Sequence, residues 1–405
     1  MGSFDSLRYR NYRLLWTGAI LSNVGTWMQS VALAWFVFLI TRSAFWVSFV
    51  TFANFIPTVL SPIGGVYTDR LDRRRILMAT QSFMMVDAAL LALLAWLHHA
   101  TLFAVMALTV GQGVAFAFNG PTWQAFVPSL VPPEAMVNAI ALNSAQFSLA
   151  RVIGPAIAGA IIAVSGSGAA IVFSVNAVSF LTVIGALALI RTEPSGSAER
   201  RPVRDLLRTG LTYAWEHRRI RTMIASIAVI SFFAAPASAL LPIFAADVYG
   251  RGAASYGALA AALGLGSVGG ALVLGRLGNR IAARIIAWAM VMVGAVLLVF
   301  GAVPSYPIGL AMMFLFGAAY LLVVSGTNSG IQLAVDDAVR GRVISIWVLA
   351  FGVAYPVGSL LAGLVASTWG PRGTIMVGAG MCGLWGLGLL RQSGPAPQAL
   401  LEPGG

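Results

Sequence analysis

The sequence predicts an all-α polytopic membrane protein, with about twelve transmembrane helices in two pseudo-symmetric six-helix lobes. Three observations predict this fold class. Of the 405 residues, 59% are hydrophobic and only 9% are charged, and the mean hydropathy of +0.87 lies far outside the range of water-soluble proteins. Apolar runs longer than about 18 residues, long enough to cross a bilayer, recur along the chain. The second half of the sequence also echoes the first.

The first lobe is expected over residues 1–191. Apolar windows bounded by charges, glycines and prolines predict spans near 12–40, 44–68, 76–97, 101–121, 138–164 and 168–190. The first run is too long for the core of a signal peptide, so we interpret it as an uncleaved span.

The apolar pattern breaks over residues 192–220, which are polar and rich in arginine. We interpret this segment as a cytoplasmic linker, with a short amphipathic helix expected around 205–215. Further spans are predicted near 221–248, 253–275, 282–302, 307–330, 343–367 and 373–391. The second lobe is therefore expected over 221–391, followed by a cytoplasmic tail over 392–405.

All 25 basic residues are arginines, and they gather at the ends of the apolar runs. With the N-terminus placed inside, 21 of them lie in cytoplasmic segments, Arg42, Arg251 and Arg372 lie outside, and Arg151 lies within a span. This bias predicts a multi-pass protein of the inner (cytoplasmic) cell membrane with both termini in the cytoplasm. It also argues against nucleic acid as a partner despite the net charge of +12, because the arginines line no soluble face.

The two halves are related by an offset of about 200 residues. "GGVYTDRLDRRRI" from Gly64 is echoed by "GGALVLGRLGNRIAARI" from Gly269, and the span that starts near 138 is echoed by the one near 343. Duplicated six-span lobes are typical of a secondary transporter whose site lies between the lobes at the membrane midplane. We therefore expect a small-molecule substrate, protons or another coupling ion, and membrane lipids as partners.

The connection between the second and third spans is unusually rich in charge. Gly65 is followed there by Asp69, Arg70, Arg73 and Arg74. A glycine pair allows close helix approach, and a carboxylate one turn later can face a helix N-terminus. From the residues alone, a simple turn that obeys the positive-inside rule remains an alternative.

This spacing resembles the G-x-x-x-D-R-x-G-R-R signature of the major facilitator superfamily, with Asp72 in place of the usual glycine. Residues 4–41 and 119–159 resemble the branch that contains the enterobactin exporter, transmembrane secretion effectors and macrolide efflux proteins. The likeness covers nearly the whole chain. It implies the major facilitator fold, export of a drug, siderophore or other amphiphilic metabolite, and a cytoplasmic gate in which Asp69 binds the start of span eleven, around 340–345, where Arg342 belongs to the gate.

A further likeness concerns coupling. Gly154, Pro155 and Gly159 resemble the glycine–proline element of antiporters, with Ala158 in place of one glycine. Thr109 stands where drug–proton antiporters often carry an arginine. The resemblance favours export by proton antiport over uptake, without the usual proton relay.

Asp87 and Arg151 are ionisable residues deep within predicted spans. Both lie roughly 16–20 Å from the inner membrane surface, at 1.5 Å per residue, so their equal depth permits a pair. Charges there cost several kcal/mol unless paired or hydrated, and both are candidates for proton coupling. The alternatives are that Arg151 binds backbone carbonyls or the substrate, and that Asp87 bonds a polar neighbour without titrating.

Polar and aromatic side chains on helical stripes are candidates for lining the central cavity. They are Asn23, Thr26, Trp27 and Gln29 in span one, Gln112, Phe116 and Asn119 in span four, Ser144 and Ser148 in span five, Asn328 in span ten, and Tyr355 in span eleven. Hydrogen bonding between helices explains the polar residues equally well, and core packing explains the aromatic ones.

Enzyme chemistry is not expected, because the spans contain no histidine and the chain lacks the nucleophile and zinc motifs of membrane hydrolases. The single Cys382 and the neighbouring His98 and His99 are too few for a metal site, so neither metal nor cofactor is predicted. A functional monomer is expected. A receptor or lipid-handling protein on a transporter scaffold, or an uptake symporter, remains the alternative.

Overall fold

A computed structural model describes residues 4–191, 211–277 and 283–392 of the chain. Its regular elements are α-helices joined by short 3₁₀ or π segments, labelled η. The first half contains η1 (Asp5–Arg8), α1 (Arg10–Thr41), α2 (Ala44–Phe55), η2 (Ile56–Leu60), α3 (Ser61–Arg70), α4 (Arg73–Trp96), α5 (Leu102–Phe126), η3 (Pro128–Leu130), α6 (Pro133–Val164) and α7 (Gly168–Leu189). The second half contains α9 (Arg218–Val229), η4 (Ile230–Ala234), η5 (Ala235–Ser238), α10 (Leu241–Ile243), η6 (Phe244–Val248), α11 (Ala253–Leu277), α12 (Ala283–Ala302), α13 (Tyr306–Ala334) and α14 (Asp337–Gln392).

These elements form twelve membrane crossings within the described residues. Ten helical stretches are long and apolar enough to cross a bilayer. The shorter apolar stretch Ala44–Leu60 continues into α3 as an eleventh. The twelfth arises because α14 is kinked at Gly370, whose φ of 81° lies in the left-handed region that favours glycine. The number agrees with the sequence prediction.

Two predicted spans are interrupted rather than continuous. The second span changes from α2 to the 3₁₀ segment η2, which contains Pro57. The seventh passes from α9 through η4, η5, α10 and η6, with Pro236 and Pro242 in its irregular part. Proline lacks the N–H that closes the α-helical hydrogen bond, so both interruptions follow from the sequence.

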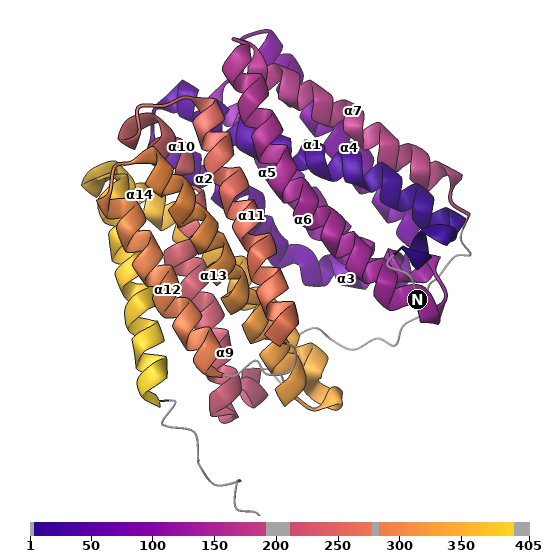
Figure 1. The fold of residues 1–405 in the computed structure, drawn as a ribbon. Coiled ribbons are helices and arrows are strands. Elements are labelled where there is room, and N and C mark those ends of the chain that lie inside the picture. Colours follow the sequence, from indigo (N-terminus) through magenta and orange to yellow (C-terminus); the bar gives the residue numbers. More distant parts are fainter. Residues whose placement is uncertain (1–3, 192–210, 278–282, 393–405) are drawn as a thin grey trace, which may run out of the picture.

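Each half packs mainly upon itself. In the first half α1 packs against α6 and α7, and α4 against α5 and α7. In the second, α11 packs against α13, and α12 against α13 and α14. Figure 1 shows the two groups of helices side by side, indigo to magenta in one and rose to yellow in the other. The halves touch chiefly through α6 with α11 and α2 with α14.

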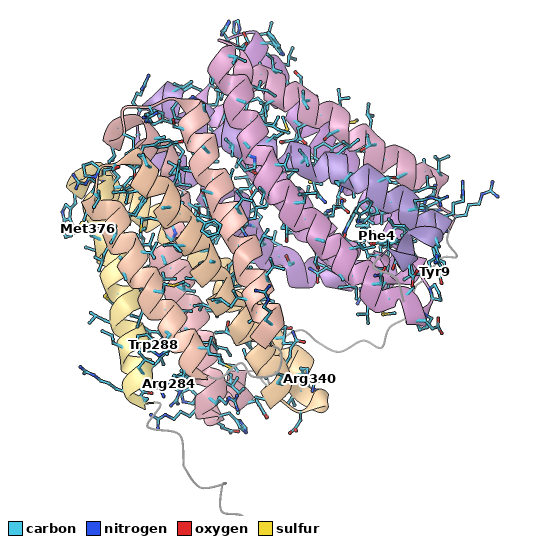
Figure 2. All side chains as sticks on the ribbon, in the orientation of Figure 1. Phe4, Tyr9, Arg284, Trp288, Arg340 and Met376 are labelled. Carbon is cyan, nitrogen blue, oxygen red and sulfur yellow. The ribbon has the colours of Figure 1, made fainter. Side chains whose placement is uncertain are left out.

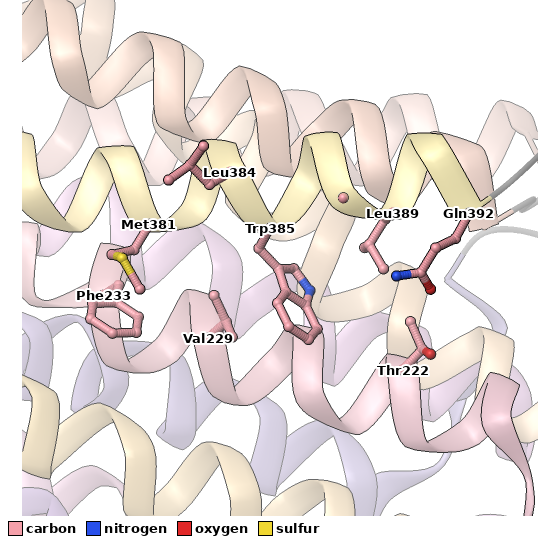
Figure 3. Close-up of a pocket in the computed structure, with 9 residues that line it drawn as sticks. Thr222, Val229, Phe233, Met381, Leu384, Trp385, Leu389 and Gln392 are labelled. Atoms are coloured by element: carbon pink, nitrogen blue, oxygen red, sulfur yellow. The ribbon is translucent and has the colours of Figure 1, made fainter.

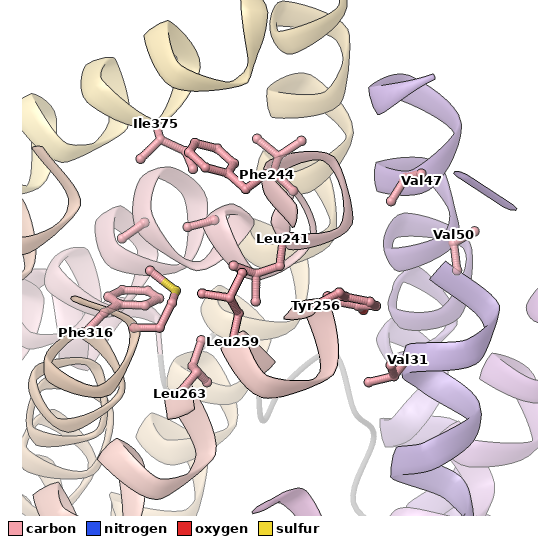
Figure 4. Close-up of a cluster of buried hydrophobic side chains, with 14 of the residues drawn as sticks. Val31, Val47, Val50, Leu241, Phe244, Tyr256, Leu259, Leu263, Phe316 and Ile375 are labelled. Carbon is pink, nitrogen blue, oxygen red and sulfur yellow. The ribbon is translucent and has the colours of Figure 1, made fainter. Parts of the chain in front are cut away.

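A shared hydrophobic core lies where the halves meet. Val31 and Val47 from the first half belong to the same buried cluster as Tyr256 and Leu259 from the second. Figure 4 shows Tyr256 pointing from α11 toward Val31 on α1. The two halves are therefore held together by apolar packing at one end of the molecule.

The arginines are predicted to gather on the cytoplasmic side of the membrane, so the end of the bundle where they lie is the inner end. Arg284 and Arg340 lie at the same end of the second half, near the start of α9 and the end of α14 (Figures 1 and 2). We call this end inner and the opposite end outer. Large apolar side chains such as Phe83, Leu90 and Leu93 on α4 are exposed on the flank of the bundle, as expected for a surface that contacts lipid.

The predicted boundaries of the lobes fall partly outside the described residues. Residues 192–210 of the expected linker lie outside the description, whereas 211–216 are helical and α9 begins at Arg218. All but the first residue of the predicted tail over 392–405 also lies outside it. The division at 191 and 221 therefore stays a prediction, consistent with the separate packing of the two halves.

Candidate functional site

The strongest candidate site lies between the halves, where α6 brings Arg151 up to the second half. Arg151 stands just past the middle of α6, and a Cβ placed on Gly264 of α11 would lie 3.0 Å from its carbonyl oxygen. The absence of a side chain on Gly264 thus lets α11 approach α6 closely at this depth. The site is consequently near the midplane and at the contact between halves, as expected for a rocking transporter.

The first half contributes an aromatic pair to this site. The guanidinium of Arg151 lies over the ring of Trp27, 5.6 Å from its centroid. Trp27 also meets Phe147 edge to face, with 5.7 Å between ring centroids. Ser144 and Ser148 are exposed on the same helix, one and two turns before Arg151, and each donates its hydroxyl to a carbonyl of α6. This wall therefore combines one cation, two rings and two hydroxyl groups.

The second half contributes a ladder of rings at i, i+4 spacing along α14. Trp347 stacks near Phe351, and Phe351 near Tyr355, with 6.2 Å between centroids in each pair. Trp347 donates its indole N–H to the Thr327 hydroxyl at 3.1 Å, and the Tyr355 hydroxyl lies 3.2 Å from that of Ser238. These hydrogen bonds fix the orientation of Trp347 and Tyr355, the first and last rings of the ladder.

Arg151 faces this second wall. It interacts electrostatically with the phenols of Tyr320 on α13 and Tyr355 on α14. Within the described residues Arg151 forms no ion pair, because the salt bridges there are Arg8–Asp5 and Arg75–Asp72. Arg151 as a whole residue is partly buried, and it carries the positive charge of the site.

The outer end of the site is closed by contacts between the halves. Phe55 packs edge to face on Tyr355, with 5.1 Å between centroids, and Trp35 stacks on Tyr256 at 6.1 Å. The backbones of Gly159 and Gly257 touch, because a Cβ placed on Gly159 would lie 2.9 Å from the Cα of Gly257. The aromatic contacts and the glycine–glycine backbone contact together close the outer end of the site.

The inner ends of the halves make few contacts with each other. α3 packs on α5, η2 and α4, all in its own half, and makes no substantial contact with the second half. Tyr67 and Leu71, at its inner end, are 49% and 51% exposed. On the other half the exposed side-chain amide of Gln332 donates to Asn328 on its own helix. The described conformation is thus sealed at the outer end and unsealed at the inner end.

The gate motif is positioned by contacts within the first half. Asp72, the departure from the superfamily signature, caps α4 by accepting a hydrogen bond from the Arg74 N–H at 2.9 Å. Arg73 donates to the Ala125 carbonyl, and Arg74 to the last carbonyls of α7. Both guanidinium groups therefore bind carbonyls at the C-terminal ends of helices, where cations are favoured.

Of the glycine pair from which close helix approach was expected, Gly64 is the one that makes it. A Cβ on Gly64 would lie 2.6 Å from the Ala117 carbonyl oxygen on α5, whereas one on Gly65 would meet nothing within 4 Å. Arg70 is exposed and Arg342 partly buried. The side chain of Asp69 lies outside the described part of the structure, so its contact with the start of span eleven stays a prediction.

The structure does not bring Asp87 and Arg151 together. Asp87 is 2% exposed on α4 and lies beside the small apolar cluster of Met84, Ala88, Ala115 and Phe180 within the first half. Neither carboxylate oxygen has a hydrogen-bond partner among the described residues. Equal depth is not enough for a pair, because α4 packs on α5 and α7, whereas α6 faces the second half. A coupling role for either residue stays a prediction.

Three predicted cavity residues are buried inside the first half. Gln29 donates to Gln112 at 3.2 Å and accepts from Asn176 at 2.7 Å, which ties α1, α5 and α7 together. Asn119 accepts hydrogen bonds from Thr80 and Gln81 on α4. In this conformation these side chains join helices, which is the alternative that the stripe pattern left open.

The remaining predicted residues are divided between the site and the helix contacts. Asn23 and Thr26 are partly buried on α1, and Phe116 is 43% exposed on α5. A Cβ on Gly154 would lie 2.6 Å from that of Trp27, so this glycine packs α6 on α1. Gly159 packs α6 across the interface, where the Pro155 carbonyl also faces Gly257.

Sequence reasoning missed part of the second wall. The i, i+4 spacing of Trp347, Phe351 and Tyr355 is visible in the sequence and would have found the ladder as a unit. Tyr320 and Phe147 carry no such signal, because single aromatic residues in apolar spans are common.

A second hollow lies on the flank of the second half, away from the interface. This groove of about 390 Å³ runs between α9 and the last segment of α14 (Figure 3). Val229 and Phe233 line one side of it, and Met381, Leu384 and Trp385 the other. Because its lining comes from the second half alone, the groove is separate from the site that surrounds Arg151.

The chain crosses the membrane twelve times within the described residues, in two halves that meet around a central site sealed at one end. This arrangement defines a membrane transporter of the major facilitator fold. A solved bacterial homologue of the iron transporter ferroportin, in an inward-facing state, superposes with a TM-score of 0.74 over 95% of this chain and 99% of that one, at 16% identity. The predicted fold class is thereby confirmed.

The chain belongs to the transmembrane secretion effector family, whose model matches residues 1–396. It is 23% identical over 386 residues to macrolide efflux protein A of Streptococcus pyogenes, covering 90% of this chain and 92% of that protein. It is 26% identical over 380 residues to the multidrug efflux pump Tap of Mycolicibacterium fortuitum, covering 90% and 91%. The family is one of transporters and not of enzymes, which confirms the sequence prediction on both points.

Proposed function

We propose that this protein is a secondary active exporter of small amphiphilic organic molecules, working by alternating access and driven by proton antiport. The observation that carries the proposal is the central site itself, which is walled by rings from both halves, sealed at the outer end and unsealed at the inner end. A site arranged in this way is loaded from the cytoplasm, as export requires. The efflux proteins named above support the same direction of transport.

The proposal places the protein in the cytoplasmic membrane as a functional monomer, with both termini inside. The arginine distribution supports this orientation, since Arg151 is the one arginine deep within a predicted span and most of the others gather on the predicted inner side. Release occurs when the contacts of Gly159, Phe55 and Trp35 with the second half open and the inner ends close. A proton gradient biases the balance between these two states.

Everted membrane vesicles test this proposal, because export then appears as uptake. The probes are dansylglycine and dansylcadaverine, which share one fluorophore and carry opposite charges. We expect vesicles that contain the protein to accumulate at least one probe when a pH gradient is imposed, and to lose it after addition of an uncoupler. Vesicles without the protein correct for passive trapping. Accumulation equal to that of the control vesicles would contradict the proposed function.

A further inference from the structure

We propose that Arg151 recognises an anionic group, so that the molecules moved by this protein carry a carboxylate, sulfonate or phosphate beside an apolar surface. The proposal rests on the proposed export function and names its substrate class. Arg151 is the position where a charge and the aromatic walls of both halves come together.

Among the described residues, no carboxylate forms an ion pair with Arg151. Of its 13 acidic residues, only Asp87 and Asp247 lie within predicted spans. Asp87 is enclosed in the first half, and Asp247 is exposed at the outer end of the seventh span. Among the described residues, therefore, no internal ion pair competes with a bound anion for Arg151.

The groups around the guanidinium suit an anion and disfavour a cation. The guanidinium carbon of Arg151 lies over the Trp27 ring, and the N–H groups of a guanidinium can bind two oxygens of an anion at once. The phenols of Tyr320 and Tyr355 on the opposite wall are neutral groups whose O–H can donate to the same oxygens. A cationic molecule would meet a like charge at the same position.

The transport cycle itself makes an anion necessary. While the inner end is unsealed, water can hydrate Arg151, which is partly accessible. When the inner ends close around a substrate, that water is displaced, and an unpaired charge near the midplane becomes costly. An anionic substrate compensates the charge at this step. Closure is then favoured by the correct cargo and disfavoured by neutral or cationic ones.

Binding to the purified full-length protein tests the inference without relying on transport. Dansylglycine and its uncharged amide differ only in the carboxylate, and dansylcadaverine carries a positive charge. We expect wild-type protein to bind dansylglycine more tightly than the amide by about tenfold or more, and R151Q to abolish this preference. R151K should retain part of it, because lysine keeps the charge but not the fork of donors.

The matched control is R251Q, which removes an arginine that also lies over a ring, that of Tyr306, at the outer end of the second half. It should bind all three probes like the wild type. Retained binding of the uncharged amide by R151Q shows that this variant is folded. Equal affinity of R151Q and wild type for dansylglycine, or no preference of the wild type for the acid over the amide, would overturn the inference.

The two proposals fail separately. Gradient-driven accumulation of dansylcadaverine that R151Q leaves unchanged would support export and refute anion recognition. A charge preference in binding without any gradient-driven accumulation would support anion recognition and refute export.

Discussion

At the scale of single residues, polar side chains in this protein perform two different tasks. Gln29, Gln112 and Asn176 are buried, and Gln29 is hydrogen-bonded to both of the others, so this network holds three helices of the first half in register. Arg151 and Phe147 are accessible at the interface between halves. Mutations in the first set should therefore change stability, and mutations in the second should change binding.

Changing Gln29→Ala removes the partner of two buried amides. We expect the free energy of unfolding to fall by about 1–3 kcal/mol, because Gln112 and Asn176 then lose hydrogen bonds that water cannot replace. Phe147→Ala, which truncates a side chain that is 45% exposed, is the matched variant and should weaken probe binding with little loss of stability. Chemical denaturation of purified protein measures both. A Gln29→Ala protein as stable as the wild type would refute the structural role of this network.

At the scale of elements, close helix contacts without side chains mark where the halves meet. Gly257 on α11 faces the Pro155 carbonyl and the Cα of Gly159 on α6, at 2.5 and 2.8 Å from the place a Cβ would occupy. No side chain fits there unless the helices separate. The outer seal thus depends on Gly159 and Gly257, which are far apart in the sequence and come into contact in the folded structure.

Changing Gly257→Val should wedge α6 and α11 apart and weaken the outer seal. Overpacking costs about 1–3 kcal/mol, which shifts the balance between states by about fivefold or more. Labelling of Ser48→Cys by an impermeant maleimide, in a Cys382→Ser background, measures the opening. Ser48 is buried in the described state and faces Gly363 of the second half.

The matched control for this wedge is Gly185→Val, at a helix position where a Cβ meets nothing within 4 Å. It should leave the labelling rate of Ser48→Cys unchanged. Labelling that is equally slow with Gly257→Val would show that this glycine contact does not keep the outer end closed.

At the scale of the whole molecule, the described conformation is one of the two that the proposed export would use. The outer contacts through Trp35, Phe55 and Gly159 must break, and the inner ends near α3 and the start of α14 must meet. Gly65 faces open space and Tyr67 is half exposed, so this inner surface has room to receive the second half. The gate motif thus lies at an inner surface where α3 makes no substantial contact with the second half.

Changing Asp69→Asn tests that gate. If the Asp69 carboxylate holds the start of span eleven in the closed state, its neutralisation removes about 0.3–2 kcal/mol of stabilisation. Export of dansyl probes by everted vesicles should then fall while membrane abundance stays normal. Asp72→Asn is the control, because it removes a charge from the same loop but keeps an oxygen that can cap α4. Equal export by Asp69→Asn and wild type would reduce the motif to a positive-inside turn.

The spans were predictable, because membrane-length apolar runs and arginine clusters depend on local sequence alone. Their two-fold arrangement was predictable because the second half of the sequence echoes the first. The interruptions at Pro57 and Pro236 were also visible in the sequence, yet hydropathy windows average over them. Arg151 was identifiable from the sequence because a charged side chain within an apolar span is costly and marks a functional candidate. In contrast, helical spacing places Gln29 and the other polar residues of its span on one face of the helix. It does not show whether that face contacts another helix or the central site. The separation of Asp87 from Arg151 likewise follows from helix packing, which depth along a span does not reveal.

The most direct test of alternating access measures both ends of the molecule in the same sample. In a Cys382→Ser background, spin labels on Tyr67→Cys and Ser345→Cys report the inner ends, and labels on Arg42→Cys and Thr368→Cys report the outer ends, all at partly or fully exposed positions. With dansylglycine and an imposed pH gradient in liposomes, we expect a population in which the inner distance shortens and the outer distance lengthens. Inner and outer distances that stay fixed, or that change in the same direction, would contradict the account.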